Sequence, residues 1–244
     1  MKEVNLQITA QQRIARDVYK MVLSGDTTAV TAPGQFVNIK LDGLYLRRPI
    51  SVCDWEPEEL TIIYKVVGKG TAQMASLPDG TVLSVLTGLG NGYDLSKSGE
   101  NPLLLGGGVG VPPLYLAAKL LRAEGRAVTA VLGFNTADDV FYQDEFRALG
   151  VRTLVTTADG SCGMRGFVTD ALTEAGAYSY VYTCGPEPML KAVYHAVETS
   201  GQFSFEERMG CGFGACMGCT CKTKYGSKRI CTDGPVLEKE EIVW

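Results

Sequence analysis

The chain has 244 residues, and 45% of them are hydrophobic, which is enough to build a sizeable buried core. Its formal net charge of −4 and its lack of a clustered Lys/Arg stripe argue against nucleic acid and anionic membranes as partners. No apolar run is long enough to cross a membrane, and the first residues lack the features of an export signal, so we expect a cytoplasmic protein.

Residues 1–99 are predicted to form a small antiparallel β-barrel. Short β-rich runs such as VNLQITA and LTIIYKVV alternate there with turn signals such as APGQ and PDG. The motif RRPIS, residues 47–51, is expected on a strand, and GKGT, residues 68–71, is expected to open a short helix. An arginine and a helix N-terminus are two independent ways of holding a phosphate. Taken alone, the two motifs also fit a solvated basic strand and an ordinary turn.

Residues 100–203 are predicted to form a doubly wound domain with a parallel sheet. The run PLLLGGGVGVPPLYLAAKLLRAEG reads as an apolar strand, a glycine-rich turn and an apolar helix. Strands and helices then alternate as far as about residue 202. Further helices are expected over residues 138–150, 166–176 and 186–201.

Two glycine- and proline-rich turns fall at the carboxyl ends of predicted strands. The amides of GGGVGVPPL, residues 106–114, precede a helix and can face an anionic pyrophosphate, although a tight turn without a ligand is the alternative. CGPEPM, residues 184–189, ends a second strand at the same edge, where open α/β sheets bind ligands. Together the turns predict a nicotinamide site. No arginine follows the neighbouring strands to meet a 2′-phosphate, which favours NADH over NADPH.

Five of the eight cysteines crowd into the segment 204–244, which is too short to build an apolar core of its own. The spacing C-x4-C-x2-C-x11-C is formed by Cys211, Cys216, Cys219 and Cys231. Its first part matches plant-type [2Fe–2S] proteins, and the surrounding glycines let the backbone approach inorganic sulfide. A zinc site with four thiolates is the alternative, although zinc ribbons usually carry two short knuckles.

The remaining cysteines and the single histidine are expected to have no redox role. Cys221 stands too close to Cys219 for both to be ligands, so we interpret it as a bystander. Cys53, Cys162 and Cys184 are scattered, as packed thiols usually are. His195 falls in a helical pattern and is expected to be a structural or surface residue.

The order of the motifs resembles the ferredoxin–NADP reductase superfamily: a barrel with RPIS and GKGT, then GGGVGVPPL, then CGPEPM. With the ending ERMGCGFGACMGC…CTDGPV, the whole chain resembles the electron-transfer subunits of type B, NAD-dependent dihydroorotate dehydrogenases. The resemblance implies FAD, NAD and a [2Fe–2S] cluster as cofactors. It implies FAD contacts at Arg48, Pro49, Ile50, Ser51, Ile63, Tyr64, Lys65, Gly70 and Thr71. It implies nicotinamide contacts at Gly107, Gly108, Gly110, Pro112, Cys184, Gly185 and Pro186, and cluster ligation by the four spaced cysteines.

The resemblance also implies an activity and a partner. Electrons would pass from an FMN-containing catalytic subunit that oxidises dihydroorotate, through the cluster and FAD, to NAD⁺ in pyrimidine biosynthesis. The assembly would be a heterotetramer with two copies of each subunit, with an interface around residues 210–232. The alternatives are a subunit of another NAD(P)H-linked iron–sulfur flavoprotein, of the ferredoxin:NADP oxidoreductase or sulfhydrogenase type, and a zinc-stabilised interaction module.

Two positions depart from the wider superfamily. Plant-type reductases carry a tyrosine where Ile50 stands, so the group that covers this face of the flavin is not assigned. Those reductases also end in an aromatic residue that stacks on the flavin, whereas here the cysteine-rich segment intervenes. That stacking role is therefore not transferred to Trp244.

Overall fold

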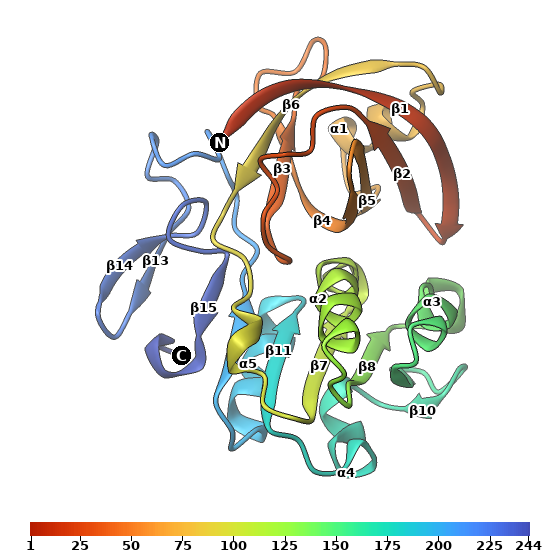
Figure 1. Cartoon of the computed structure of the whole chain (residues 1–244), viewed down its shortest axis with the longest axis vertical. Helices are drawn as coiled ribbons and strands as arrows, with labels where there is room; N and C mark the ends of the chain where they lie inside the picture. Colours follow the sequence, from red (N-terminus) through yellow and green to blue (C-terminus); the bar gives the residue numbers. More distant parts are fainter.

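The N-terminal part of the chain forms a closed barrel, and side chains of its first strand are alternately buried and exposed (Figure 1). In the computed structural model, which describes all 244 residues, Val4, Leu6 and Ile8 point into the barrel and their neighbours point outward. The barrel strands are β1 (Lys2–Ala15), β2 (Val18–Ser24), β3 (Phe36–Ile39), β4 (Arg48–Glu56), β5 (Glu59–Lys65) and β6 (Val82–Leu89). Their order is β1-β2-β5-β4-β3-β6, all pairs are antiparallel, and α1 (Lys69–Ala75) lies between β5 and β6.

The second part is a seven-stranded sheet with helices on both faces, as predicted. In order across the sheet its strands are β10 (Met164–Arg165), β9 (Arg152–Thr157), β8 (Thr129–Phe134), β7 (Pro102–Gly107), β11 (Tyr180–Cys184), β12 (Gly201–Ser204) and β15 (Val236–Glu238). The helices are α2 (Pro112–Ala123), α3 (Gln143–Ala148), α4 (Leu172–Ala175) and α5 (Glu187–Ala196). Leu104 and Leu132 pack with α2 and α3, whereas Leu103 and Val131 face α4 and α5. This alternation makes the domain doubly wound.

Two of the expected helices are broken. The stretch 138–150 is a 3-10 turn at Ala137–Asp139 followed by α3, because Tyr142 adopts a left-handed conformation (φ 65°) between them. The stretch 166–176 is a 3-10 turn at Val168–Ala171 followed by α4. Other 3-10 turns lie at Leu95–Lys97, Gly108–Gly110 and Lys239–Glu241.

The cysteine-rich segment contains a hairpin of β13 (Thr220–Thr223) and β14 (Gly226–Arg229), drawn beside β15 in Figure 1. Its last strand, β15, joins the large sheet, antiparallel to β12. Ile230 and Ile242 belong to the same group of buried apolar side chains as Leu103 and Val131, on the sheet face that carries α4 and α5. The segment therefore shares a core with the α/β domain, and the residue boundaries at 99/100 and 203/204 stay predictions.

The barrel and the α/β domain are fastened to each other along α2. Lys119 of α2 donates to both carboxylate oxygens of Asp54 at 3.1 Å and forms an ion pair with Glu56. Leu116 of the same helix is 2% exposed and packs with the barrel core. These contacts hold the two domains together. None of the helices is both long and apolar enough to cross a membrane.

Candidate functional site

The carboxyl edge of the parallel sheet brings the two glycine- and proline-rich turns together. β7 and β11 are neighbours, with Gly106 opposite Cys184. A Cβ atom on Gly110 would lie 2.2 Å from the carbonyl oxygen of Cys184, and one on Gly107 would lie 2.3 Å from Sδ of Met189. The two turns therefore pack closely enough that only glycine fits at these positions.

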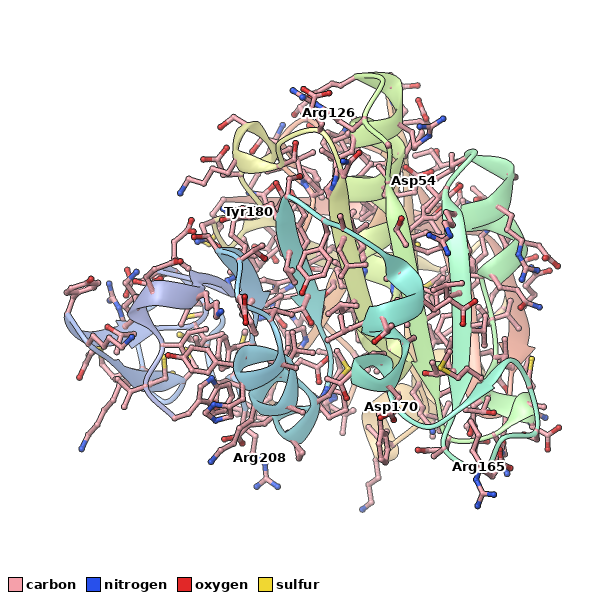
Figure 2. All side chains as sticks on the ribbon, turned by 90° about the horizontal axis from the view of Figure 1, so that it is seen from below. Asp54, Arg126, Arg165, Asp170, Tyr180 and Arg208 are labelled. Carbon is pink, nitrogen blue, oxygen red and sulfur yellow. The ribbon has the colours of Figure 1, made fainter.

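A cavity of about 410 Å³ opens at this edge. Figure 2 shows Arg165 and Asp170 at the carboxyl edge, opposite Arg126 and Tyr180 at the amino edge. The cavity lining comes from both domains and includes Val18, Lys65, Gly107, Gly108, Asn135, Asp139, Phe167, Pro186 and Met189. Its volume is that of an ordinary small-molecule site, and its place is where open α/β sheets bind nucleotides.

Of the seven residues expected to contact the nicotinamide, some line the cavity and the others are buried. Gly107, Gly108 and Pro186 line the cavity. The other four, Gly110, Pro112, Cys184 and Gly185, are buried behind its wall. Burial raises the pKa of the Cys184 thiol, so this side chain stays protonated and serves as packing.

Sequence reasoning missed several lining residues, including Phe167 and Thr169. They stand in segments that follow strand ends, and that position was the only signal available. Lys65 was expected to contact FAD, and the structure places it on the wall of this cavity.

One lining residue, Asp139, is an ionised carboxylate with its own cation. Arg16 of the barrel donates to it from Nε at 3.2 Å and from Nη2 at 3.1 Å. Desolvation by burial acts to raise the pKa of Asp139, but hydrogen bonds from Arg16 and Thr136 outweigh it and lower that pKa. The crevice thus carries an ion pair, Asp139 with Arg16, at the point where the two domains meet.

The barrel stretches expected to bind FAD lie where two strands separate. β4 pairs with β5 only from Val52 to Glu56, whereas residues 48–51 of β4 pair with β3 alone. Residues 63–65 of β5 pair only with β2. Each stretch therefore keeps one unpaired main-chain edge, and the two edges face each other. Such edges offer N–H and C=O groups to a bound ligand.

Arg48 lies against the first turn of α1. A Cβ atom on Gly70 would come within 1.9 Å of Nε of Arg48, so glycine is required there while the guanidinium keeps this position. The hydroxyl of Thr71 is already used inside the turn, because it accepts from the amides of Val67 (2.9 Å) and Gly68 (3.3 Å). A guanidinium beside an unpaired strand edge fits a ligand that carries a phosphate.

The side chains of Ile63 and Tyr64 are not available to a cofactor. Both are at most 3% exposed, and the Tyr64 hydroxyl donates to Oε1 of Gln11 at 2.8 Å. Any FAD contact at these two positions is made by the main chain. Ile50 and Ser51 are only half-buried and remain accessible.

The four spaced cysteines come together as two pairs. The amide of Cys216 donates to Sγ of Cys211 at 3.4 Å, and the amide of Cys211 donates back to Sγ of Cys216 at 3.5 Å. The amide of Cys231 donates to Sγ of Cys219 at 3.4 Å. Desolvation opposes ionisation of Cys211, but the amides of Phe213 and Cys216 lower its pKa to about 6.

The paired arrangement fits one of the two metal chemistries that the spacing allowed. A [2Fe–2S] cluster spreads four thiolates over two irons, which suits two pairs of sulfurs. Gly212 (φ 79°) and Gly214 (φ 90°) give the loop the left-handed turns that bring its amides onto the sulfurs.

The other cysteines and the histidine differ in exposure, and their lack of a redox role stays a prediction. None of the eight cysteines forms a disulfide. Cys53 and Cys184 are buried, and Cys221 is half-buried on β13. His195 is exposed on α5, with its ring edge against Tyr194.

Comparison with known proteins places these features in families. Residues 206–243 match the family described as the iron–sulfur cluster binding domain of dihydroorotate dehydrogenase B, and residues 104–195 match the oxidoreductase NAD-binding domain. Two similar curated proteins are both named dihydroorotate dehydrogenase B (NAD(+)), electron transfer subunit. The one from Shouchella clausii is 44% identical over 99% of this chain and 98% of its own length. The one from Fusobacterium nucleatum is 46% identical over 99% of both chains.

Solved structures show the same architecture. A chain from the structure of the NADH-dependent reduced ferredoxin-NADP oxidoreductase superposes with a TM-score of 0.89 at 33% identity, covering 98% of this chain and 90% of its own. Phthalate dioxygenase reductase superposes with a TM-score of 0.64 at 21% identity over 80% of this chain and 64% of its own, which shows the fold alone. The predicted fold class is confirmed.

Proposed function

The chain belongs to the family of dihydroorotate dehydrogenase B electron transfer subunits, and we propose that it carries electrons from a dihydroorotate-oxidising catalytic subunit to NAD⁺ in pyrimidine biosynthesis. When bound, FAD exchanges two electrons with NAD(H) and single electrons with a [2Fe–2S] cluster. The chain's own residues hold these groups in place and exclude water. It is an oxidoreductase subunit, and no residue described above is assigned to dihydroorotate.

Each cofactor is assigned to one of the sites described. The unpaired edges at residues 48–51 and 63–65, with Arg48, Gly70 and Thr71, hold FAD. The cavity at Gly107, Gly108 and Pro186 holds the nicotinamide nucleotide, and the buried residues Gly110, Pro112, Cys184 and Gly185 shape its wall. The cluster is held by Cys211, Cys216, Cys219 and Cys231.

The observation that carries the proposal is that the three sites are contiguous. β3 pairs with residues 48–51 and also contacts the cysteine loop, where Asn38 donates to the carbonyl oxygen of Cys211 at 3.2 Å. At the other end, Lys65 closes the stretch 63–65 and lines the nucleotide cavity. A flavin held between β4 and β5 thus has the cluster loop on one side and the nicotinamide cavity on the other.

The charge at the crevice supports NAD over NADP. Asp139 lines the cavity as an ionised carboxylate, and no arginine stands in the segments NTADD and ADGS after β8 and β9. The Arg16 guanidinium is already engaged by Asp139, so neither segment offers a free arginine to a 2′-phosphate.

A catalytic partner subunit follows from the family name, and we propose an FMN protein assembled with this chain as two copies of each in the cytoplasm. Support for an interface at residues 210–232 comes from apolar side chains that the cysteine loop leaves in solvent. Phe213 is 45% exposed and Met217 is 57% exposed. Clustered exposed apolar side chains are typical of contact surfaces.

The test uses the chain alone and then the complex. The purified chain, loaded with FAD and cluster, should reduce ferricyanide with NADH and should not oxidise dihydroorotate. Dihydroorotate-dependent reduction of NAD⁺ should begin when the catalytic subunit is added. Oxidation of dihydroorotate by the chain alone would contradict the proposal, and so would a reconstituted complex that passes no electrons to NAD⁺.

A second candidate is a subunit that serves a different acceptor. It is favoured by the 33% identity to the ferredoxin-NADP oxidoreductase chain over 98% of this chain. Identifying the flavoprotein that co-purifies with the tagged chain separates the two. The zinc-stabilised module is disfavoured by the paired sulfurs, and a colourless preparation that takes up zinc but neither flavin nor iron would revive it.

A further inference from the structure

The four cluster thiols stand on two separate stretches of chain. Cys211 and Cys216 begin and end the cysteine loop, whereas Cys219 and Cys231 flank the β13–β14 hairpin (Figure 1). The hairpin itself holds the second pair, since the amide of Ile230 donates to the carbonyl oxygen of Cys219 at 3.0 Å. A [2Fe–2S] cluster needs both pairs at a fixed separation. The contacts between the loop and the hairpin therefore decide how well the site is preformed.

Arg229 reaches from the hairpin to the loop. It is the last residue of β14, and it pairs with Thr220, directly after Cys219. Its Nη1 donates to the carbonyl oxygen of Gly214, within the cysteine loop, at 3.0 Å. The amide of Gly214 lies beside Sγ of Cys231. The guanidinium thus holds the residue at which the loop meets the second cysteine pair.

The packing around Gly214 leaves no room for a side chain there. Gly214 has φ 90°, and a Cβ atom would lie 2.8 Å from Cγ2 of Thr232 and 3.2 Å from Nη1 of Arg229. Glycine is the residue that tolerates both the left-handed backbone and the close approach. The loop and the hairpin therefore touch directly at this point.

Asp233 holds the guanidinium in its orientation. Oδ2 of Asp233 accepts from Nε of Arg229 at 3.4 Å and from the main-chain amide of Arg229 at 2.8 Å. The amides of Thr232 and Asp233 donate back to the carbonyl oxygen of Arg229 at 3.0 and 2.7 Å, which closes the turn that carries Cys231. A guanidinium presents its donors in a rigid planar fork, so it can serve Asp233 and Gly214 together, whereas a lysine ammonium is a single point of charge.

We propose that Arg229 is a positioning residue that locks the cysteine loop onto the hairpin, sets the separation of the two thiol pairs and raises the reduction potential of the cluster. The cluster becomes more negative when it accepts an electron, so a fixed cation nearby stabilises its reduced form. The Arg229 side chain is 36% exposed, so solvent weakens this effect of the charge without removing it. The inference rests on the proposed function, because it requires a [2Fe–2S] cluster on the four thiols.

Two variants separate the geometry from the charge. Arg229→Lys keeps the charge but loses the fork, and Arg229→Gln loses both. The matched control is Arg208→Gln, which removes the same charge three residues before Cys211, from an exposed side chain without a hydrogen bond or ion pair in the protein (Figure 2). Each protein is loaded with FAD and cluster, and its flavin content shows whether it is folded. Cluster release is timed by the colour that an iron(II) chelator develops, and the midpoint potential is taken from a redox titration followed by EPR.

We expect both Arg229 variants to release iron at least about fivefold faster than the native protein, the effect of one lost hydrogen bond. Only Arg229→Gln should also lower the midpoint potential, by at least about threefold in the reduction equilibrium, or about 28 mV for one electron. Arg208→Gln should keep the native release rate and potential. Native release or a native potential in Arg229→Gln would overturn the inference, as would equal changes in Arg208→Gln. If Arg229→Gln fails to take up FAD, the release rate of Arg229→Lys decides, and a native rate there overturns the inference. None of these results touches the proposed function, which fails only if the native complex passes no electrons to NAD⁺.

Discussion

Replacing Gly110 by alanine tests whether the two turns at the sheet edge form the nucleotide site. The new Cβ atom would lie 2.2 Å from the carbonyl oxygen of Cys184. An ordinary carbon–oxygen contact is about 3.3 Å, so the turns must move apart by roughly 1 Å. Both atoms in the clash are held by main chain, on the turn before α2 and at the end of β11, so no side-chain rotation relieves it. A misplacement of about 1 Å in a site of this kind costs up to ~10²-fold in rate.

The assay is steady-state reduction of ferricyanide by NADH, with flavin and iron content measured on the same sample. Gly110→Ala should lower kcat/KM for NADH by about ten- to a hundredfold while keeping FAD and cluster, which lie in other parts of the chain. Gly125→Ala is the control for general destabilisation, because Gly125 (φ 82°) also disfavours a side chain but lies beyond the far end of α2, where its Cβ would meet nothing within 4 Å. A Gly110→Ala protein within twofold of native kcat/KM would refute the assignment of this edge to the nucleotide.

Three further results are expected. Cys216→Ser should abolish the EPR signal of the reduced cluster, and Cys221→Ser should leave it unchanged, because only the first thiol belongs to the paired set. Asp139→Asn should lower the thermal unfolding midpoint at neutral pH. Desolvation opposes ionisation of Asp139, but hydrogen bonds from Arg16 and Thr136 outweigh it and lower the folded-state pKa of Asp139. The ionised carboxylate therefore stabilises the fold above its ordinary pKa, and this stabilisation is lost as the pH falls through the lower folded-state pKa. The difference from the native midpoint should therefore shrink below about pH 4, and a constant difference would contradict the assignment. Phe213→Lys should weaken binding of the catalytic subunit at least about tenfold in a pull-down titration while the NADH–ferricyanide rate stays native, since the exposed ring is assigned only to the interface.

Much of the architecture could be predicted because each motif sits at an element boundary that local rules define. The alternation in β1, the apolar run of β7 and the proline-led start of α2 all follow from periodicity and backbone chemistry. The cysteine spacing predicted that these thiols lie near one another, and the structure pairs Cys211 with Cys216 and Cys219 with Cys231. The breaks in the stretches 138–150 and 166–176 were missed because both patterns are helical and only tertiary packing interrupts them.

The residues that line the nucleotide cavity could not be predicted from local sequence patterns. Lys65 and Asp139 belong to different domains, and they line one cavity only because α2 docks on β4. The burial of the Tyr64 side chain, which limits it to main-chain contacts, depends on its hydrogen bond to a glutamine in β1. Such facts depend on long-range pairing, and no short motif contains them.

The cysteine-rich segment shows how a short stretch without its own core can still be rigid enough to carry a redox centre. β15 adds an edge strand to the large sheet through Phe203 opposite Leu237, and the amide of Asn91 in the barrel holds Val236 through both of its polar atoms. The segment is therefore tied to both domains by contacts within the protein. Since electron transfer depends on fixed distances between cofactors, this double attachment places the thiol pairs relative to the flavin stretch by protein contacts alone.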